Sequence, residues 1–393
     1  MKFLLIYVPN LRFSFEEDWC TSTIGENFRL SSGLTPSTKE KAYFNNGIIP
    51  WINSGELKNK YISFTENKLT LDAVKKHNLT IYPMDTMVIA IYGLEAAGVR
   101  GKASITKMDS TISQSCMAFN SLGNVLTQFM YYVYKKEAQI LGTRYAQGTK
   151  QQNLSSDLLS SYKLLYPSKE EQLKIVNFLS LIDEKIETQS KIIDDLLTVK
   201  NGISNKLFKL QQIELSNHYL FEYLIEGDKT AVDTSCYKKI TVKLNNQGLA
   251  FSELNREMAD TRPFYVRHKG ELIIGKQNYF NGSIAIVTEQ FDNCICSNAI
   301  MSFKIKGIYS DFLYYQISNN NYLNSQSYKA NGTGQKELSE KEFLNFKIWC
   351  PQLEVQQKIV NCFKSLDLKI ENEKAILNSY FQEKSYLLNN MFI

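Results

Sequence analysis

The sequence predicts an α+β protein in which two mixed α/β domains are separated by two long helices that pair as an antiparallel coiled coil with pseudo-two-fold symmetry. Three observations support this fold: a gapless internal repeat, two long heptad patterns, and two strand-rich segments that differ from each other. The predicted boundaries are a first domain at 1–167, a first helix at 168–210, a second domain at 211–351 and a second helix at 352–393.

The internal repeat covers the end of each domain and the start of each helix. The segment that begins at Gln147 aligns without a gap with the segment that begins at Asn331, at a constant offset of 184 residues. The matched pairs include Gly148 and Gly332, Leu154 and Leu338, Pro167 and Pro351, Gln172 and Gln356, and Asp183 and Asp367. A match of this length indicates that the chain contains two copies of one structural unit.

Each repeat contains one long helix. The first is predicted to begin at Ser168, because Glu171 three residues later completes a capping-box pattern just after Pro167. Apolar residues then recur at alternating steps of three and four as far as Leu207, and the second copy repeats the pattern. An average spacing of 3.5 residues kept over this length predicts a coiled-coil seam rather than a helix packed only on its own domain.

Each seam is interrupted by two polar residues at equivalent positions. These are Gln189 and Lys200 in the first helix and Glu373 and Lys384 in the second. An antiparallel pairing that opposes Lys200 to Glu373 and Gln189 to Lys384 leaves every other layer apolar, whereas a parallel pairing would oppose two lysines at high cost. We therefore expect these four residues to fix the register of the coiled coil.

The segments outside the helices are strand-rich. Residues 19–167 and 216–351 contain short apolar or alternating runs, such as 87–91 and 272–274, separated by Gly, Asn and Lys clusters. This pattern is typical of mixed α/β domains with loop-rich sheets. The two segments share little sequence outside their last thirds, so the chain reads as variable domain, helix, variable domain, helix.

Composition sets only broad limits. The formal net charge of +5 is compatible with an anionic partner but does not require one. The seven scattered cysteines, with no histidine cluster near them, predict reduced thiols rather than a zinc site. The N-terminus does not match a signal peptide and no stretch is long enough to span a membrane, so a cytoplasmic location is expected.

Several motifs together resemble one known family, the specificity subunit of type I restriction–modification systems, over nearly the whole chain. They are Val8-Pro9-Asn10-Leu11-Arg12-Phe13 with Trp19, the Ile49-Pro50-Trp51-Ile52 run, and the duplicated G-T-x(4)-L-S and Pro-x(4)-Gln-x-Lys-Ile-Val segments. The second half lacks a clear counterpart of Trp19 and of the Pro-Trp pair, so the start of the second domain is left open.

The resemblance implies a division of labour. Each variable domain would be a target-recognition domain for one half of a split double-stranded DNA sequence. The paired helices would act as a ruler and as the docking site for methyltransferase (M) subunits, expected to number two, and restriction (R) subunits would join that complex. S-adenosylmethionine, ATP and Mg would then belong to the partner subunits.

The sequence lacks the motifs that a methyltransferase, a nucleotide-binding enzyme or a nuclease would need. No two of the seven prolines are adjacent, which excludes the Asn/Asp-Pro-Pro-aromatic loop of amino-methyltransferases, and there is no P-loop and no complete Gly-x-Gly-x-x-Gly. No cluster of carboxylates suggests a nuclease metal site. We therefore predict a non-catalytic chain with no metal and no cofactor of its own.

Polar loops are the candidate DNA contacts, because Lys and Arg suit phosphates and guanine while Gln and Asn suit adenine. The first-domain candidates are Tyr92, Arg100, Lys102, Arg144, Tyr145 and Lys150. The second-domain candidates are Lys276, Gln277, Asn278 and Tyr279, which follow the apolar run 272–274 as Tyr92 follows 88–89.

Two other functions stay open at this point. The chain could be a free-standing DNA methyltransferase or nuclease on the same scaffold, which the missing motifs disfavour. It could also be a coiled-coil scaffold with no role in DNA binding, which salt-sensitive DNA binding by the assembled complex would exclude.

Overall fold

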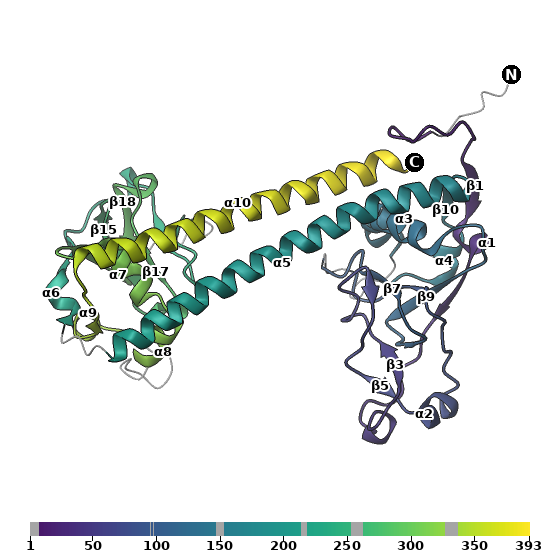
Figure 1. Cartoon of the computed structure of the whole chain (residues 1–393), viewed down its shortest axis with the longest axis horizontal. Coiled ribbons are helices and arrows are strands. Elements are labelled where there is room, and N and C mark those ends of the chain that lie inside the picture. The colour runs from purple at the N-terminus through teal and green to yellow at the C-terminus, as the bar shows by residue number, and fades with distance from the viewer. Residues whose placement is uncertain are drawn as a thin grey trace. The chain divides into compact units, whose positions relative to one another are not determined.

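The computed structural model describes residues 8–94, 96, 98–146, 153–213, 218–252, 262–326 and 337–393. The chain divides into two compact units (Figure 1). The first unit is Met1–Gln189 together with Ile376–Ile393, and the second unit is Ser190–Ala375. Each unit contains one strand-rich domain and a stretch of both long helices, so each is built from residues of both sequence repeats.

The two long helices are α5 (Lys169–Ile213) and α10 (Leu353–Met391). Helix α5 begins as the capping pattern predicts, because the Ser168 hydroxyl accepts a hydrogen bond from the Glu171 backbone N–H at 3.4 Å. Neither helix is apolar over the length that a bilayer requires, and the same holds for every other helix in the described residues.

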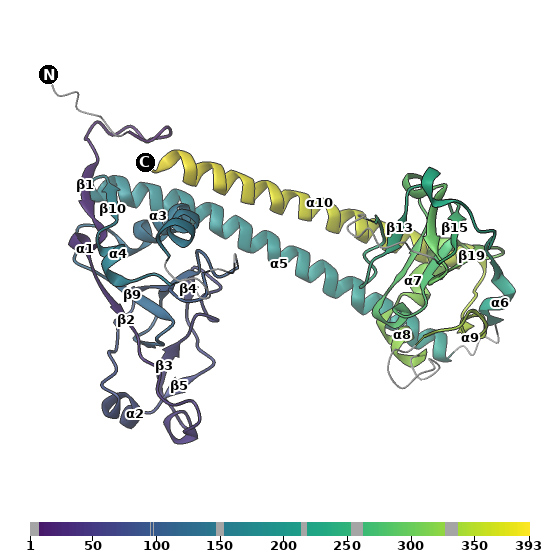
Figure 2. The same cartoon turned by 180° about the vertical axis from the view of Figure 1, so that it is seen from behind.

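The helices run antiparallel within the first unit. Asp183 of α5 forms an ion pair with Lys384 of α10, and the Lys185 ammonium lies 5.6 Å from the centroid of the Tyr380 ring. Residue numbers therefore rise along α5 as they fall along α10, and both views show this stretch of the two helices side by side (Figures 1 and 2).

The second unit has the same antiparallel arrangement. Lys200 of α5 pairs with Asp367 of α10, and further along α5 Leu207 lines a small cavity together with Ile359 and Phe363. The sequence prediction of two mixed α/β domains with paired antiparallel helices is confirmed.

Within its described residues, the first unit contains a five-stranded sheet and two smaller sheets. The order of the large sheet is β2-β9-β6-β7-β4, and all neighbours are antiparallel except β4 and β7. These strands are β2 (Phe28–Ser32), β4 (Tyr61–Ile62), β6 (Met87–Ala90), β7 (Ala103–Thr106) and β9 (Cys116–Ser121). The others are β1 (Cys20–Thr23) with β10 (Lys163–Tyr166), and β3 (Ile49–Ile52) with β5 (Lys68–Leu69) and β8 (Thr111–Ile112).

Helix α3 (Thr127–Ile140) connects this sheet to the long helices. Its side chains Phe129 and Tyr132 are fully buried and share a core with Leu179 of α5 and Met391 of α10. Burial of each such side chain contributes about 1.5–3 kcal/mol, so this core fixes the domain on the helix pair. The remaining helices of the unit are α1 (Ile24–Asn27), α2 (Leu71–Lys76) and α4 (Ser156–Ser160), with shorter turns at Lys41–Tyr43 and Leu141–Tyr145.

The described residues of the second unit form a four-stranded antiparallel sheet of order β12-β19-β16-β17 and three two-stranded sheets. The large sheet consists of β12 (Leu224–Glu226), β16 (Leu272–Gly275), β17 (Ile284–Ile286) and β19 (Ile300–Ile305). The pairs are β11 (His218–Tyr219) with β20 (Lys347–Ile348), β13 (Ile240–Val242) with β14 (Leu249–Phe251), and β15 (Phe264–Arg267) with β18 (Cys294–Ser297).

The helices of the second unit surround an aromatic core. They are α6 (Leu220–Tyr223), α7 (Ser310–Ile317), α8 (Asn320–Gln326) and α9 (Glu340–Leu344), with turns at Thr234–Cys236, Tyr279–Asn281 and Glu289–Phe291. Phe303, Phe312 and Phe343 pack with Val360 of α10 in one buried cluster. The second domain is therefore held on α10 by the same kind of apolar contact that holds the first domain on α5 and α10.

The structure extends the repeat to the start of the second domain, which the sequence left open. The Ile24 backbone N–H donates to the Tyr162 carbonyl, and the Leu220 N–H donates to the Phe346 carbonyl, both at 3.0 Å. Phe346 follows Tyr162 by the known offset of 184 residues, but Leu220 follows Ile24 by 196. The order β11-α6-β12 therefore repeats β1-α1-β2, and this part of the second domain is 12 residues closer to its helix in sequence.

Candidate nucleic-acid interface

A buried glutamine joins each domain to its long helix. The Gln172 amide group donates to the carbonyls of Pro167 at 2.9 Å and Asn124 at 3.2 Å, and its oxygen accepts from the Leu126 N–H at 2.8 Å. Leu126 is the residue just before α3, so Gln172 satisfies one of the free N–H groups at the start of that helix. We call this contact the glutamine bridge.

The second domain has the same glutamine bridge. Gln356 donates to the Pro351 carbonyl at 2.8 Å and accepts from the Tyr309 N–H, just before α7, at 3.0 Å. The duplicated Pro-x(4)-Gln pattern thus has a structural role. Each glutamine binds the backbone at the start of the helix that follows a large sheet, which is α3 in the first domain and α7 in the second. Each glutamine is at most 1% exposed.

Two of the four polar seam residues, Lys200 and Lys384, form ion pairs between the long helices. Lys200 binds Asp367, and Lys384 binds Asp183 with Nζ and Oδ1 separated by 2.5 Å. Each of these carboxylates lies six residues before the residue predicted to face the lysine, Glu373 or Gln189. The sequence argument considered only seam positions, but a long lysine side chain can leave the seam for a flanking carboxylate. The register role of the four residues stays a prediction.

Tyr92, Arg100 and Lys102 lie on the segment between β6 and β7. Tyr92 is 37% exposed and pairs with Asn153 through an isolated antiparallel bridge. Arg100 and Lys102 are half-buried, and the Arg100 Nε donates to the Leu94 carbonyl at 2.7 Å. The aromatic ring of Tyr92 is therefore available to a ligand, while part of the Arg100 guanidinium supports its own loop.

A lysine that the sequence analysis missed supports the same loop. The Lys135 ammonium donates to the Gly101 carbonyl at 2.6 Å, and burial, reinforced by the charge of Lys384, lowers the pKa of Lys135 to about 8. Lys60 is a second lysine that the sequence analysis missed. Its ammonium donates to the Tyr132 hydroxyl at 2.7 Å and lies 3.6 Å from Asp183. No local sequence pattern distinguishes these lysines from surface lysines.

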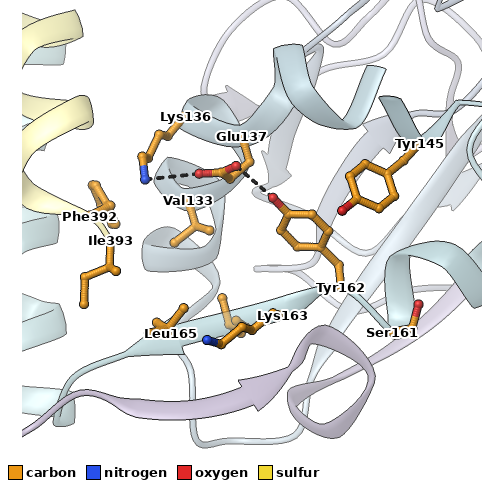
Figure 3. A pocket seen from close by; sticks show the side chains of 11 residues that line it. Val133, Lys136, Glu137, Tyr145, Ser161, Tyr162, Lys163, Leu165, Phe392 and Ile393 are labelled. Carbon is orange, nitrogen blue, oxygen red and sulfur yellow. Dashed lines mark hydrogen bonds and ion pairs between the residues drawn. The ribbon is translucent and has the colours of Figure 1, made fainter. Parts of the chain in front are cut away.

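Arg144 and Tyr145 lie on the π-helical turn after α3. Arg144 and Tyr145 are both exposed, and the Tyr145 ring packs edge-on against Tyr162, with centroids 5.4 Å apart. Tyr145 also lines a cavity of about 520 Å³ with Lys136 and Phe392 (Figure 3). Lys150, the remaining first-domain candidate, lies outside the described residues.

The second-domain candidates divide into two groups. Gln277 and Asn278 are exposed, and Lys276 is half-buried with its ammonium 3.7 Å from the Glu340 carboxylate. Tyr279 is a correction, because its side chain is fully buried and its hydroxyl donates to the Ile317 carbonyl at 3.0 Å.

The burial of Tyr279 has a tertiary cause. Its ring packs against Phe343 and Phe346, which lie more than 60 residues later in the chain, and burial raises its pKa well above the ordinary value. A tyrosine buried in this way packs inside the domain and supports the loop, so we no longer count Tyr279 among the candidate DNA contacts.

The predicted equivalence of the two candidate loops is visible in the backbone. The Leu154 N–H donates to the Ile91 carbonyl, and the Leu338 N–H donates to the Lys276 carbonyl, both at 3.0 Å. Leu154 and Leu338 are the leucines of the duplicated G-T-x(4)-L-S segment, whose first residues lie outside the described ranges. The described end of each copy therefore packs beside the loop that follows an inner strand of each large sheet, β6 in the first domain and β16 in the second.

No metal-ion chemistry is indicated by the described part of the chain. It contains no group of three or more His, Cys, Asp or Glu side chains placed to bind a metal ion. All seven cysteines are free thiols, and Cys116 and Cys296 are buried. Each unit thus presents exposed polar loop residues, such as Arg144 in the first unit and Gln277 in the second.

Comparison with solved structures supports this fold. The crystal structure of a type I restriction–modification S subunit from M. genitalium superposes with a TM-score of 0.60 at 18% identity, covering 98% of this chain and 99% of that chain. A structure described under complex assembly and conformational transition of the type I R-M system gives a TM-score of 0.58 at 11% identity, covering 97% and 99%.

Comparison with curated proteins finds specificity subunits. The chain is 32% identical over 182 residues to the MjaIX specificity subunit of Methanocaldococcus jannaschii, and 26% identical over 181 residues to the EcoR124I/EcoR124II specificity subunit of Escherichia coli. These matches span 44% and 45% of this chain but only 40% and 44% of the relatives. The MjaVIII specificity subunit matches at 22% identity over 95% of this chain and 92% of its own length.

A family model described as the type I restriction modification DNA specificity domain matches the chain twice, at residues 16–198 and 204–379. The two matches together cover most of the sequence, and each takes in one variable domain and the larger part of the long helix that follows it. This chain belongs to the family of type I restriction–modification specificity subunits.

Proposed function

We propose that the chain is the DNA-recognition subunit of a type I restriction–modification enzyme, in which each variable domain recognises one half of a split target. The observation that carries this proposal is the duplication itself. Two domains of different sequence are attached to equivalent places on a repeated frame, through the same glutamine bridge. A constant frame with variable loops is what independent recognition of two half-sites requires.

The proposed DNA contacts are the candidate loop residues other than the buried Tyr279. In the first domain they are Tyr92, Arg100, Lys102, Arg144, Tyr145 and Lys150. In the second domain they are Lys276, Gln277 and Asn278. Exposed amides suit the bidentate recognition of adenine, and the cations suit phosphate or guanine.

Changes in the second-domain loop test this assignment. Gln277→Ala or Asn278→Ala should cost about 1–3 kcal/mol at one base pair of the target if that amide makes a bidentate contact. Lys276→Ala should weaken binding to all sequences and reduce the slope of log K against log salt by about one unit. The measurement is DNA binding by the assembled complex as a function of salt and of target sequence.

Lys306→Ala is the matched control for that experiment. Lys306 is exposed and follows β19 at the end of the sheet opposite to Lys276, since Gly275 pairs with Ile300 at one end and Leu272 with Phe303 further along. It should leave both affinity and salt slope unchanged. Equal effects of Lys276→Ala and Lys306→Ala would move the DNA contact away from the loop.

The partners follow from the same proposal. The curated relatives are named as subunits of type I restriction enzymes, and one similar structure is described under assembly of the type I system. We propose that this chain binds double-stranded DNA and assembles with methyltransferase and restriction subunits, with one methyltransferase subunit for each repeat of the frame. S-adenosylmethionine, ATP and Mg²⁺ would be bound by those partners.

The chain alone is predicted to be catalytically inert. Purified to homogeneity and incubated with S-adenosylmethionine and target DNA, it should transfer no methyl groups above background, because no motif for the cofactor or the base amine is present. Addition of the partner methyltransferase subunit should restore transfer. Methylation by the chain alone would contradict the proposal and favour a free-standing enzyme.

A further inference from the structure

The two ion pairs between the long helices belong to a larger arrangement that occurs once in each unit. In the first unit, the Tyr132 hydroxyl of α3 donates to Asp183 Oδ2 of α5 at 2.6 Å, and Lys384 of α10 donates to Asp183 Oδ1 at 2.5 Å. One carboxylate thus joins the domain, its own helix and the opposite helix. We call this tyrosine–aspartate–lysine arrangement the clasp.

The second unit contains an equivalent clasp. The Tyr315 hydroxyl of α7 donates to Asp367 Oδ2 at 2.9 Å, and Lys200 of α5 donates to Asp367 Oδ1. The aspartates and the lysines are each related by the 184-residue offset of the repeat, and each tyrosine is the sixth residue of its helix. The arrangement therefore follows the pseudo-two-fold symmetry of the chain.

Each clasp is partly shielded from water. The side chains of Asp183 and Lys384 are 18% and 21% exposed, and those of Asp367 and Lys200 are 35% and 28% exposed. Burial, followed by the charge of the adjacent aspartate, raises the pKa of Tyr132. A protonated tyrosine and a lysine on one shielded carboxylate form charge-assisted hydrogen bonds, which are stronger than an exposed ion pair.

The clasp gives each domain a second attachment to its helix. Asp183 lies 11 residues after Gln172 on α5, which is close to three turns, or about 16 Å along the same face. The glutamine bridge holds the start of α3 and the clasp holds Tyr132 near its middle. Contact at one point would permit rotation, whereas two points this far apart fix the angle of α3, and with it the sheet, on α5.

We propose that Lys384 and Lys200 are positioning residues, each of which fixes the recognition domain of the opposite repeat for its half-site. Lys384 belongs to the second repeat but completes the clasp of the first domain, and Lys200 does the reverse. The inference rests on the proposed function for its DNA readout, although the contact itself can be tested without DNA. It predicts that a substitution in the long helix of one repeat loosens the recognition domain of the other repeat.

The test uses Lys384→Met and Lys200→Met in the complex with the methyltransferase subunits. Methionine keeps the length of the side chain and removes the charge. Lys200→Met should speed amide hydrogen exchange in α7 about tenfold and leave α3 unchanged, since loss of a hydrogen bond to a charged group has an effect of this order. It should also reduce discrimination at the second half-site only, measured as methylation of targets altered in one half or the other.

Lys384→Met should act on α3 and on the first half-site. Its effect should be smaller, because the Lys60 ammonium remains 3.6 Å from Asp183 and donates to the Tyr132 hydroxyl. The double variant Lys60→Met with Lys384→Met should bring the effect to the tenfold level of Lys200→Met. The matched controls are Lys191→Met on α5 and Lys374→Met on α10, both exposed, which should change neither domain.

Milder variants keep the test valid if a methionine variant fails to assemble. Tyr315→Phe removes one hydrogen bond and should loosen α7 by less than tenfold. Tyr132→Phe removes the bonds of its hydroxyl to Asp183, Lys60 and Ser180 and should loosen α3. Both variants leave the lysine–aspartate ion pair in place. The proposal is overturned if Lys200→Met loosens α3 instead of α7, if both half-sites lose discrimination equally, or if exchange in both helices is unchanged. If the unaltered complex methylates no split target, the proposed function fails, while the exchange data still decide whether the clasp exists.

Discussion

Replacing residues 216–349 with the corresponding segment of another family member is expected to change one half of the methylated target and to leave the other half unchanged. The replaced segment contains the whole second domain, including the β11–β20 strand pair that closes it. The first domain and both long helices stay as they are. The measurement is the set of methylated bases in the DNA of a host that carries the altered subunit with its partners.

Two contacts decide which donor segments will work. The frame contributes Gln356 and Asp367, whose partners Tyr309 and Tyr315 lie inside the replaced segment. A donor therefore needs a tyrosine at the sixth position of the helix equivalent to α7 and a free N–H just before that helix. A donor that lacks both features should assemble poorly whatever its target sequence.

The reciprocal replacement is the control. Exchange of residues 19–167 should change only the other half of the target. If either exchange alters both halves, the two domains do not recognise DNA independently and the modular interpretation is wrong. An unchanged target after both exchanges would place DNA recognition outside the variable domains.

The largest expected effect on stability comes from the glutamine bridges. Gln172→Ala leaves the Leu126 N–H, the buried Pro167 carbonyl and the partly buried Asn124 carbonyl without their partner, which should destabilise the first unit by about 2–4 kcal/mol. Gln356→Ala should do the same to the second unit, at the lower end of that range because one of its three hydrogen bonds goes to the Cys350 sulfur, a weak acceptor. Hydrogen exchange read separately for each unit is the right measurement, since a protein of two units need not unfold in one step.

Gln357→Ala is the matched control for Gln356→Ala. The two residues are neighbours on α10, but the Gln357 side chain bonds only locally, to Asn361 one turn along the helix. Its loss should change stability by no more than about 0.5 kcal/mol. Equal effects of the two substitutions would show that the bridge does not hold the domain to the helix.

The sequence predicted the frame of the molecule because the signals for it are local or repeated. Heptad spacing depends only on residues three and four apart, and it indicated both long helices. The repeat offset of 184 residues matches Gln172 with Gln356 and Asp183 with Asp367, and it requires no information on contacts between distant residues. Symmetry also required that antiparallel helices exchange equivalent contacts, which the ion pairs of Lys200 and Lys384 satisfy.

Only the tertiary structure decided what each polar residue does. Tyr279 stands in a loop with lysine, glutamine and asparagine, but Phe343 and Phe346 pack on its ring and remove it from the surface. The lysines of the seam bind Asp367 and Asp183, because a flexible side chain finds a carboxylate by distance and not by heptad position. Burial and ion pairing depend on residues far apart in the chain, whereas helix periodicity does not, and that difference separates what the sequence determined from what it left to the fold.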